Sequence, residues 1–262
     1  MLEHHRQTME NFVNKLKVDA SCLAVITSGS VARDRAKETS DVDVHLLVTD
    51  ESYEAHARNN NLSYVDREAS TYEGGYVDVK VINLRFLELA AERGNEATRY
   101  AFTGSQVLFS RIPELERLVA RIPIYPEENR ERNLQDFSAQ IHLYAFYFSK
   151  EAAKNNDAYL MAHTVSNLVF YSGRMILAYN RMLFPCHKAL LDTVETAPHK
   201  PEDFKQRATE LLLNPNVNKS TRFAAMMLSF HNPGLSSDQA LGIYVKNNER
   251  NWIDQPPPLS DR

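Results

Sequence analysis

The chain has 262 residues, of which 43% are hydrophobic and 10% aromatic, and its formal net charge is −4. This composition excludes a disordered or fibrous chain, and the acidic balance argues against a nucleic-acid backbone as the main partner, because such binding needs a basic surface. No apolar run reaches the roughly 20 residues of a membrane span and the N-terminus lacks a signal-peptide pattern, so we expect a cytoplasmic monomer or homodimer.

The first 110 residues alternate helical and strand patterns. Apolar residues that recur every three or four positions indicate a helix, whereas short apolar or alternating runs that end in turn residues indicate strands. The expected elements are, in chain order, a helix around 9–16, strands at 22–27 and 41–48, a helix at 51–60, a hairpin-like strand pair at 62–66 and 76–82, a helix at 84–92, a strand at 106–110 and a helix from Pro113.

The two prolines of IPIYP (122–126) mark the best candidate domain boundary, because the strand patterns largely stop there. Beyond it, apolar residues follow helical spacing over 134–148 and 160–182, and shorter helices are expected at 186–194, 201–213, 220–230 and 237–246. We therefore expect an α+β domain at 1–122, an all-α helical bundle domain that binds the acceptor at 127–250, and an extended tail at 251–262.

The segment GSVARDRAKETSDVDV (29–44) lies between two expected strands and carries the most chemical information. Gly29 allows a sharp turn and a close approach of the backbone to a phosphate group. Ser30 adds a hydroxyl beside the N–H groups at the start of a following helical turn. Together they predict a binding site for the phosphates of a nucleotide.

Asp41 and Asp43 alternate with two valines, so on a strand both carboxylates face one side. Mg²⁺ is bound by a few carboxylates together with waters and substrate phosphates. Asp78 stands between two further valines on a strand that can lie next to the first, and would complete a two-metal site for in-line displacement at the α-phosphorus of a nucleoside triphosphate. Asp78 then either binds metal or accepts the proton of the acceptor hydroxyl.

In these features the chain resembles the DNA polymerase β-like nucleotidyltransferase superfamily, in particular the minimal nucleotidyltransferases and the antibiotic adenylyltransferases for aminoglycosides and lincosamides. The resemblance rests on Gly29-Ser30, Asp41-x-Asp43 and Asp78 and covers about the first 110 residues. It implies a mixed sheet flanked by helices, phosphates at Gly29-Ser30, and metal held by the aspartates. The implied reaction is Mg²⁺-dependent transfer of a nucleoside monophosphate, with ATP favoured as the donor, to a hydroxyl of a small molecule such as an antibiotic.

Three further positions bear on this resemblance. Arg33 and Ser40 extend the match to the pattern GS-x-x-R…SD-x-D, and both are therefore implied to bind nucleotide, whereas Asp34 stands where those enzymes usually carry glycine. Lys188 follows Pro185 and starts an expected helix. The antibiotic transferases place a lysine of their helical domain on the phosphates, which implies this role for Lys188, although a solvated surface lysine fits the sequence equally well.

Two alternatives remain. The chain could be a non-catalytic or toxin–antitoxin type member of the same superfamily that modifies or regulates a macromolecule, although such members are expected to lose at least one aspartate. The helical half could be an RNase of the HEPN type, whose arginine and histidine Arg181 and His187 would match in spacing, but Pro185 lies between them and would break the helix that carries both. The acceptor itself is left open by the sequence.

Overall fold

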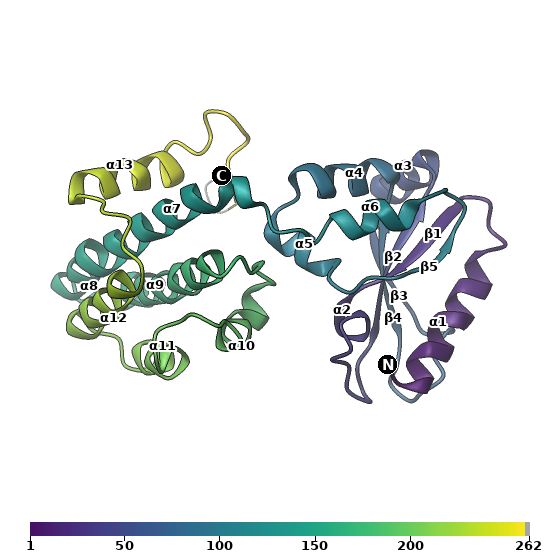
Figure 1. The fold of residues 1–262 in the computed structure, drawn as a ribbon, viewed down its shortest axis with the longest axis horizontal. Helices are drawn as coiled ribbons and strands as arrows, with labels where there is room; N and C mark the ends of the chain where they lie inside the picture. The colour runs from purple at the N-terminus through teal and green to yellow at the C-terminus, as the bar shows by residue number, and fades with distance from the viewer. Residues whose placement is uncertain (260–262) are drawn as a thin grey trace. The chain divides into compact units, whose positions relative to one another are not determined.

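In the computed structural model the chain divides into two compact units, Met1–Tyr125 and Pro126–Arg262, and residues 1–259 are described (Figure 1). The first unit combines a five-stranded sheet with helices and the second is helical. The expected fold class, α+β followed by all-α, is therefore confirmed. Of the expected tail at 251–262, residues 260–262 lie outside the described residues.

The sheet of the first unit is mixed, with the strand order β3-β4-β2-β1-β5. The strands are β1 Cys22–Thr27, β2 Val42–Val48, β3 Ser63–Asp66, β4 Val77–Ile82 and β5 Val107–Ser110. Strands β2 and β4 pair in parallel, and the other neighbours are antiparallel. All five strands were expected from the sequence to within one residue at either end, and β2 begins one residue after Asp41.

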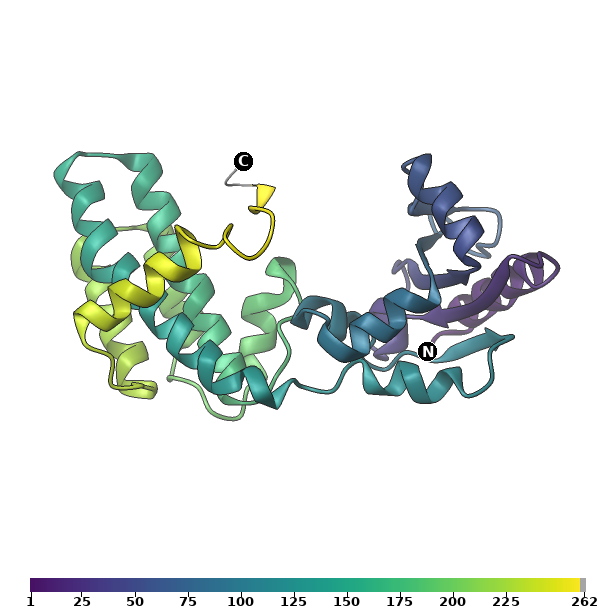
Figure 2. The ribbon, with the colours of Figure 1, turned by 90° about the horizontal axis from the view of Figure 1, so that it is seen from above.

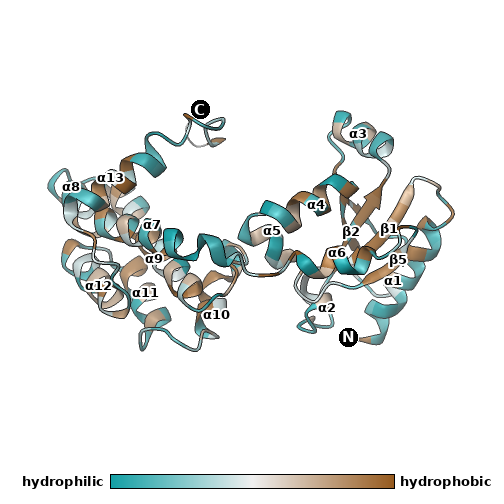
Figure 3. Ribbon diagram, turned by 45° about the horizontal axis from the view of Figure 1, so that its top comes forward, coloured by the Kyte–Doolittle hydropathy of each residue, from teal (hydrophilic) through white to brown (hydrophobic). Residues whose placement is uncertain are grey.

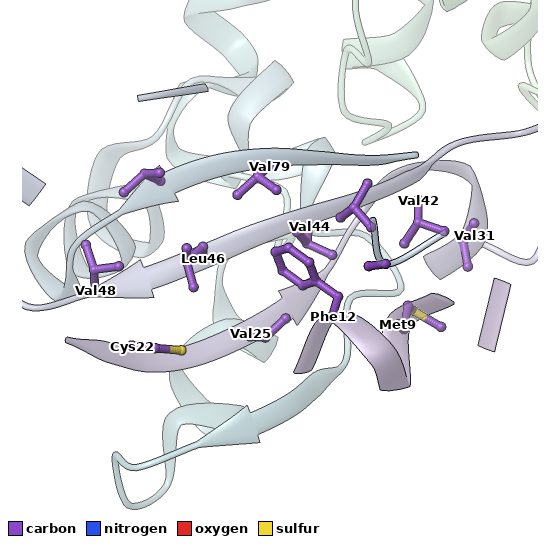
Figure 4. Close-up of a cluster of buried hydrophobic side chains, with 13 residues drawn as sticks. Met9, Phe12, Cys22, Val25, Val31, Val42, Val44, Leu46, Val48 and Val79 are labelled. Atoms are coloured by element: carbon purple, nitrogen blue, oxygen red, sulfur yellow. The ribbon is translucent and has the colours of Figure 1, made fainter. Parts of the chain in front are cut away.

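Helices cover both faces of this sheet. The helices of the first unit are α1 Glu3–Leu16, α2 Gly29–Ala32, α3 Asp50–Arg58, α4 Leu84–Arg93, α5 Glu96–Ala101 and α6 Leu115–Arg121. On one face α1 inserts Phe12 beside Val44 and Val25 (Figure 4). On the other face α4 and α6 contribute Leu87 and Val119 to a second apolar cluster.

The helix α5 was not expected, because its buried side chains are charged rather than apolar. Glu96 and Arg99 are both buried. The Arg99 guanidinium donates to five main-chain carbonyls, those of Gly94, Ala91, Glu92, Ile122 and Ile124. These bonds compensate for the burial of the charge, but a helix built in this way leaves no apolar periodicity in the sequence.

The two strands that carry the aspartates are anchored by valines. Val42, Val44, Val77 and Val79 are fully buried, and each such side chain stabilises the fold by roughly 1.5–3 kcal/mol relative to an exposed one. The hydropathy of β1 and β2 is correspondingly high (Figure 3). Because the side chains of a strand alternate between faces, burying these valines turns the intervening residues to the opposite face.

The second unit is a helical bundle. Its elements are η1 Glu127–Asn129, α7 Arg130–Leu143, η2 Tyr144–Phe148, α8 Ser149–Lys154, α9 Ala158–Tyr179, η3 His187–Ala189, α10 Leu190–Glu195, α11 Phe204–Leu213, α12 Val217–Phe230 and α13 Ser237–Asn248. The helix α7 packs along both α9 and α13 (Figure 2). Among the described residues, no helix combines the length and the apolar character that a membrane crossing requires.

Two expected helices of this unit differ in the structure. The apolar pattern over 134–148 predicts one regular helix, but the segment η2 is a π-helical turn inserted between α7 and α8, a feature that helical spacing alone does not reveal. The helix expected at 186–194 is a 3₁₀ turn, η3, followed by α10. Lys188 therefore lies on a single 3₁₀ turn and does not start an α-helix.

Candidate functional site

The parallel pairing of β2 and β4 brings the three aspartates together. Asp43 and Asp78 are register partners across the two strands, and Asp41 lies two residues before Asp43. One carboxylate oxygen from each of the three lies within 4.8 Å of the others, and all three side chains are half-buried. Hard oxygen donors in this number are what Mg²⁺ prefers, so the residues fit a divalent cation.

The three carboxylates repel one another, and this repulsion contributes to a raised pKa of Asp43. Burial, together with the charges of Asp41 and Asp78, raises the pKa of Asp43 to about 6, while Arg33 and Lys80 act in the opposite direction. Three carboxylates this close need a cation to remain ionised together. A bound metal would supply that charge, and its binding would release a proton from Asp43 at a pH near or below 6.

Gly29 allows the Asp43 carboxylate to lie against the turn after β1. Its φ is +68°, and a Cβ built on it would lie 1.7 Å from Asp43 Oδ2. The Ser28 N–H donates to the Asp43 carbonyl at 2.9 Å, which holds the turn against β2. Ser30 is the second residue of the single helical turn α2, and its carbonyl accepts from the Arg35 N–H at 2.9 Å.

Asp34 takes the backbone conformation that glycine usually provides. Its φ is +56°, in the left-handed region that aspartate enters more readily than most residues. The departure from the glycine of the resembled enzymes therefore leaves a left-handed residue at this position of the loop.

Ser40 is held in place by contacts from distant parts of the first unit. Its hydroxyl accepts from the Lys37 N–H at 2.9 Å. Its carbonyl accepts from His5 Nε2 at 3.0 Å and from the Tyr72 hydroxyl. His5 is fully buried, and because a carbonyl only accepts, Nε2 carries the proton. These contacts fix the backbone directly before Asp41.

Tyr76, directly before β4, and Lys80, on β4, lie two residues to either side of Asp78. The nearby Asp41 carboxylate raises the pKa of the Tyr76 hydroxyl. Lys80 Nζ donates to both carboxylate oxygens of Asp78, at 2.9 and 3.1 Å. Neither residue was singled out in the sequence, although residues two positions from Asp78 on a strand share its face. His5 and Tyr72, which support the Ser40 carbonyl, belong to no sequence motif that would identify them as site residues.

Residues 9–99 match the profile of a family described as the nucleotidyltransferase domain. That stretch contains the Gly29 turn and all three aspartates. Residues 9–99 form a nucleotidyltransferase domain. The chain is accordingly an enzyme of the transferase class, whose general reaction is the transfer of a nucleoside monophosphate. The expected relationship to nucleotidyltransferases is confirmed.

Comparison with solved structures finds more distant likenesses to the whole chain. A nucleotidyltransferase-like protein from Exiguobacterium sibiricum has 11% identity and a TM-score of 0.49, with 95% of this chain and 78% of that chain covered. The spectinomycin adenyltransferase AAD(9) from Enterococcus faecialis, solved with ATP and spectinomycin, has 16% identity and a TM-score of 0.37, with 86% and 98% covered. Neither likeness is close enough to bear on activity. A search of curated protein sequences gives no match.

Arg33, like the aspartates, belongs to the nucleotidyltransferase domain. It follows α2 directly, and its guanidinium lies over the ring of Tyr100 at 4.9 Å from the centroid. This cation–π contact orients a long side chain that would otherwise be mobile. Arg33 is close enough to Asp43 for its charge to lower the pKa of that carboxyl.

The candidate residues Lys188, Arg181 and His187 lie after the nucleotidyltransferase domain, in the second unit. Lys188 is exposed on η3 in the second unit. Arg181 lies beyond the end of α9, has a φ of +55°, and pairs with Glu127 at 2.8 Å. Arg181 and His187 therefore do not share a helix, which removes the arrangement that the RNase alternative requires.

Proposed function

We propose that the chain is a Mg²⁺-dependent adenylyltransferase that moves AMP from ATP to a hydroxyl group of a small-molecule acceptor. The observation that carries the proposal is the meeting of the Asp41, Asp43 and Asp78 carboxylates within 4.8 Å of one another, beside the Gly29 turn. The choice of ATP, and of antibiotics as the first acceptors to test, rests on the resemblance of this motif to the antibiotic adenylyltransferases.

Each residue has a proposed role. Asp41 and Asp43 hold Mg²⁺, and Asp78 either contacts the metal as well or accepts the proton of the attacking hydroxyl. When bound, the metal neutralises charge on the triphosphate. The backbone at Gly29 and Ser30 receives phosphate oxygens. Arg33, Ser40 and, in the second unit, Lys188 are proposed nucleotide-binding residues, the last on the resemblance alone.

Asp78 is suited to the proton-accepting role by its position. It is the aspartate on β4, next to the edge strand β3, and its side chain is 26% exposed. A general base must be within hydrogen-bond reach of the acceptor hydroxyl, which requires this access from solvent. The acceptor-binding role of the helical domain at 127–250 is proposed on the resemblance alone.

The non-catalytic alternative predicts a site that has lost at least one of the three aspartates. A protein that has lost transfer activity has no need to keep three mutually repelling carboxylates in contact, since their repulsion destabilises the fold when no metal is present. All three are kept, and the turn at Gly29 leaves room for one of them. The site therefore does not fit the non-catalytic alternative.

The test has two parts. First, calorimetry should detect binding of ATP that depends on Mg²⁺, and Asp43→Asn should lose it, while Asp192→Asn, which alters a surface ion pair with Lys205, should keep it. Second, pyrophosphate release should be screened with four nucleoside triphosphates against aminoglycosides, lincosamides and hydroxyl-bearing metabolites. The absence of Mg²⁺-dependent nucleotide binding in the unaltered protein would overturn the proposal whatever the acceptor.

A further inference from the structure

Lys80 is held beside Asp78 by contacts from two strands. Its Nζ donates to Asp78 Oδ1 at 2.9 Å, to Asp78 Oδ2 at 3.1 Å and to Ser63 Oγ at 2.7 Å. Ser63 is the register partner of Lys80 on the edge strand β3. An ammonium has three N–H donors, so these contacts use all of them and fix a flexible side chain in one place.

The other two aspartates have different companions. Asp41 lies near the neutral Tyr76 hydroxyl, whose pKa it raises, and Asp43 lies against Gly29. Among the described residues, Lys80 is the cation that forms an ion pair with a member of this group. The three carboxylates are therefore unequal, because one already has its counter-charge.

This inequality bears on the number of metal ions. In two-metal sites the ions lie about 3.5–4 Å apart, and the second ion needs a carboxylate of its own to hold it near the acceptor oxygen. At this site that carboxylate is Asp78. A second dication there would share both carboxylate oxygens with the Lys80 ammonium, and the two positive charges would repel each other.

We propose that Lys80 takes the place of the second metal ion, so that the site holds a single divalent cation together with one fixed ammonium. This inference rests on the proposed function and replaces the two-metal expectation drawn from the sequence. In the absence of nucleotide, a dication and the Lys80 ammonium would together carry three positive charges against the three carboxylates. Lys80 also orients Asp78, whose carboxylate is held from the β3 side.

The experiment counts Mn²⁺ ions, which stand in for Mg²⁺ and are paramagnetic. The full chain is titrated with Mn²⁺ in the presence of an ATP analogue whose α–β bridge is a methylene group. Electron paramagnetic resonance measures the number of ions per chain and whether they are coupled, since two ions about 4 Å apart interact magnetically. We expect one uncoupled ion in the unaltered protein and two coupled ions in Lys80→Gln and Lys80→Ala.

Lys15→Gln is the matched control. Lys15 is exposed to nearly the same extent as Lys80, 45% against 48%, and also pairs with carboxylates, those of Asp66 and Glu68, but it lies on α1. The Lys15→Gln variant should bind one Mn²⁺ ion, as we expect of the unaltered protein. Circular dichroism of each variant checks that the fold is kept.

Each outcome decides the question. A coupled pair in the unaltered protein would overturn the inference and leave the proposed function standing. A single ion in both Lys80 variants would also overturn it, because Lys80 would not be what excludes the second ion. No bound ion in the unaltered protein would overturn the proposed function and this inference together.

Discussion

Asp43 on β2 and Asp78 on β4 face each other as register partners in a parallel strand pair. A slip of one residue would send Asp78 into the core and bring a valine to the site, because every side chain of the strand would change face. The fully buried Val77 and Val79 prevent that slip. The packing of the core therefore determines which carboxylates meet.

Replacing Asp78 with asparagine should separate binding from turnover. The amide keeps the size of the side chain and one of its oxygens, so nucleotide should still bind with an affinity close to normal. Transfer should fall by roughly 100-fold or more, because loss of a positioned general base typically removes a factor of about 10²–10⁴. Single-turnover measurements with a working acceptor, set beside calorimetric binding, check this expectation. Normal turnover would rule out both roles proposed for Asp78.

The substitution Gly29→Ala should weaken metal binding through a direct clash. The new Cβ would lie 1.7 Å from Asp43 Oδ2, so the carboxylate must move. The left-handed backbone, with a φ of +68°, adds a cost of about 1–2 kcal/mol. Calorimetric titration with Mn²⁺ should show at least a roughly 10-fold weaker affinity, in line with typical effects of disturbing the surroundings of a metal ligand.

Gly74→Ala separates the clash from the backbone strain. Gly74 has a φ of +72°, and a Cβ there would meet nothing within 4 Å. Gly74→Ala should therefore lose a similar amount of stability in denaturant unfolding and keep its affinity for Mn²⁺. Equal losses of Mn²⁺ affinity in the two variants would mean that strain, and not contact with Asp43, is responsible.

The sheet and its aspartates were predictable because they depend on local patterns. Valines alternate with aspartates on β2 and β4, and this period of two assigns each carboxylate to the face opposite the core. The same rule applied two residues to either side along β4 would have placed Tyr76 and Lys80 beside Asp78. Their contacts with Asp41 and Asp78 were thus within reach of the sequence.

Other parts of the site depend on contacts between distant residues. His5 bonds the carbonyl of Ser40, 35 positions away, and no spacing in the sequence connects the two. Aspartate enters the left-handed region more readily than most residues, but this preference alone does not predict the left-handed φ of Asp34. The helix α5 is held by a buried arginine, which apolar periodicity cannot detect. Tertiary contacts decided each of these features.

Tyr72→Phe should weaken metal binding from a distance. The Tyr72 hydroxyl donates to the Ser40 carbonyl, and without it this carbonyl loses one of its two donors. Because indirect supports of a metal ligand are typically worth a factor of about 10–100 in affinity, Mn²⁺ should bind roughly 10-fold more weakly. The control is Tyr64 on β3, whose ring stacks on His56 of α3, and Tyr64→Phe should leave Mn²⁺ affinity unchanged. An unaltered affinity in Tyr72→Phe would show that His5 alone holds this carbonyl.

The stability of the metal-free protein should fall as the pH rises through the titration of Asp43. Its pKa is raised from 3.8 to about 6 in the folded chain, so folding favours the protonated form. The contribution to stability is complete below the unfolded pKa and is lost as the pH rises through the folded pKa. After allowance for solvent screening, the loss is of order 1–2 kcal/mol.

The variant Asp43→Asn isolates this effect, because an amide does not titrate. In EDTA at about pH 7.5 its melting temperature should exceed that of the unaltered protein, and the margin should shrink towards zero near pH 4. Saturating Mg²⁺ should reverse the order at the higher pH, since only the carboxylate gains from the cation. Calorimetric melting of both proteins, with and without Mg²⁺, checks all three statements. If the unaltered protein were the more stable in EDTA at the higher pH, repulsion within the aspartate group would not be a significant cost of this fold.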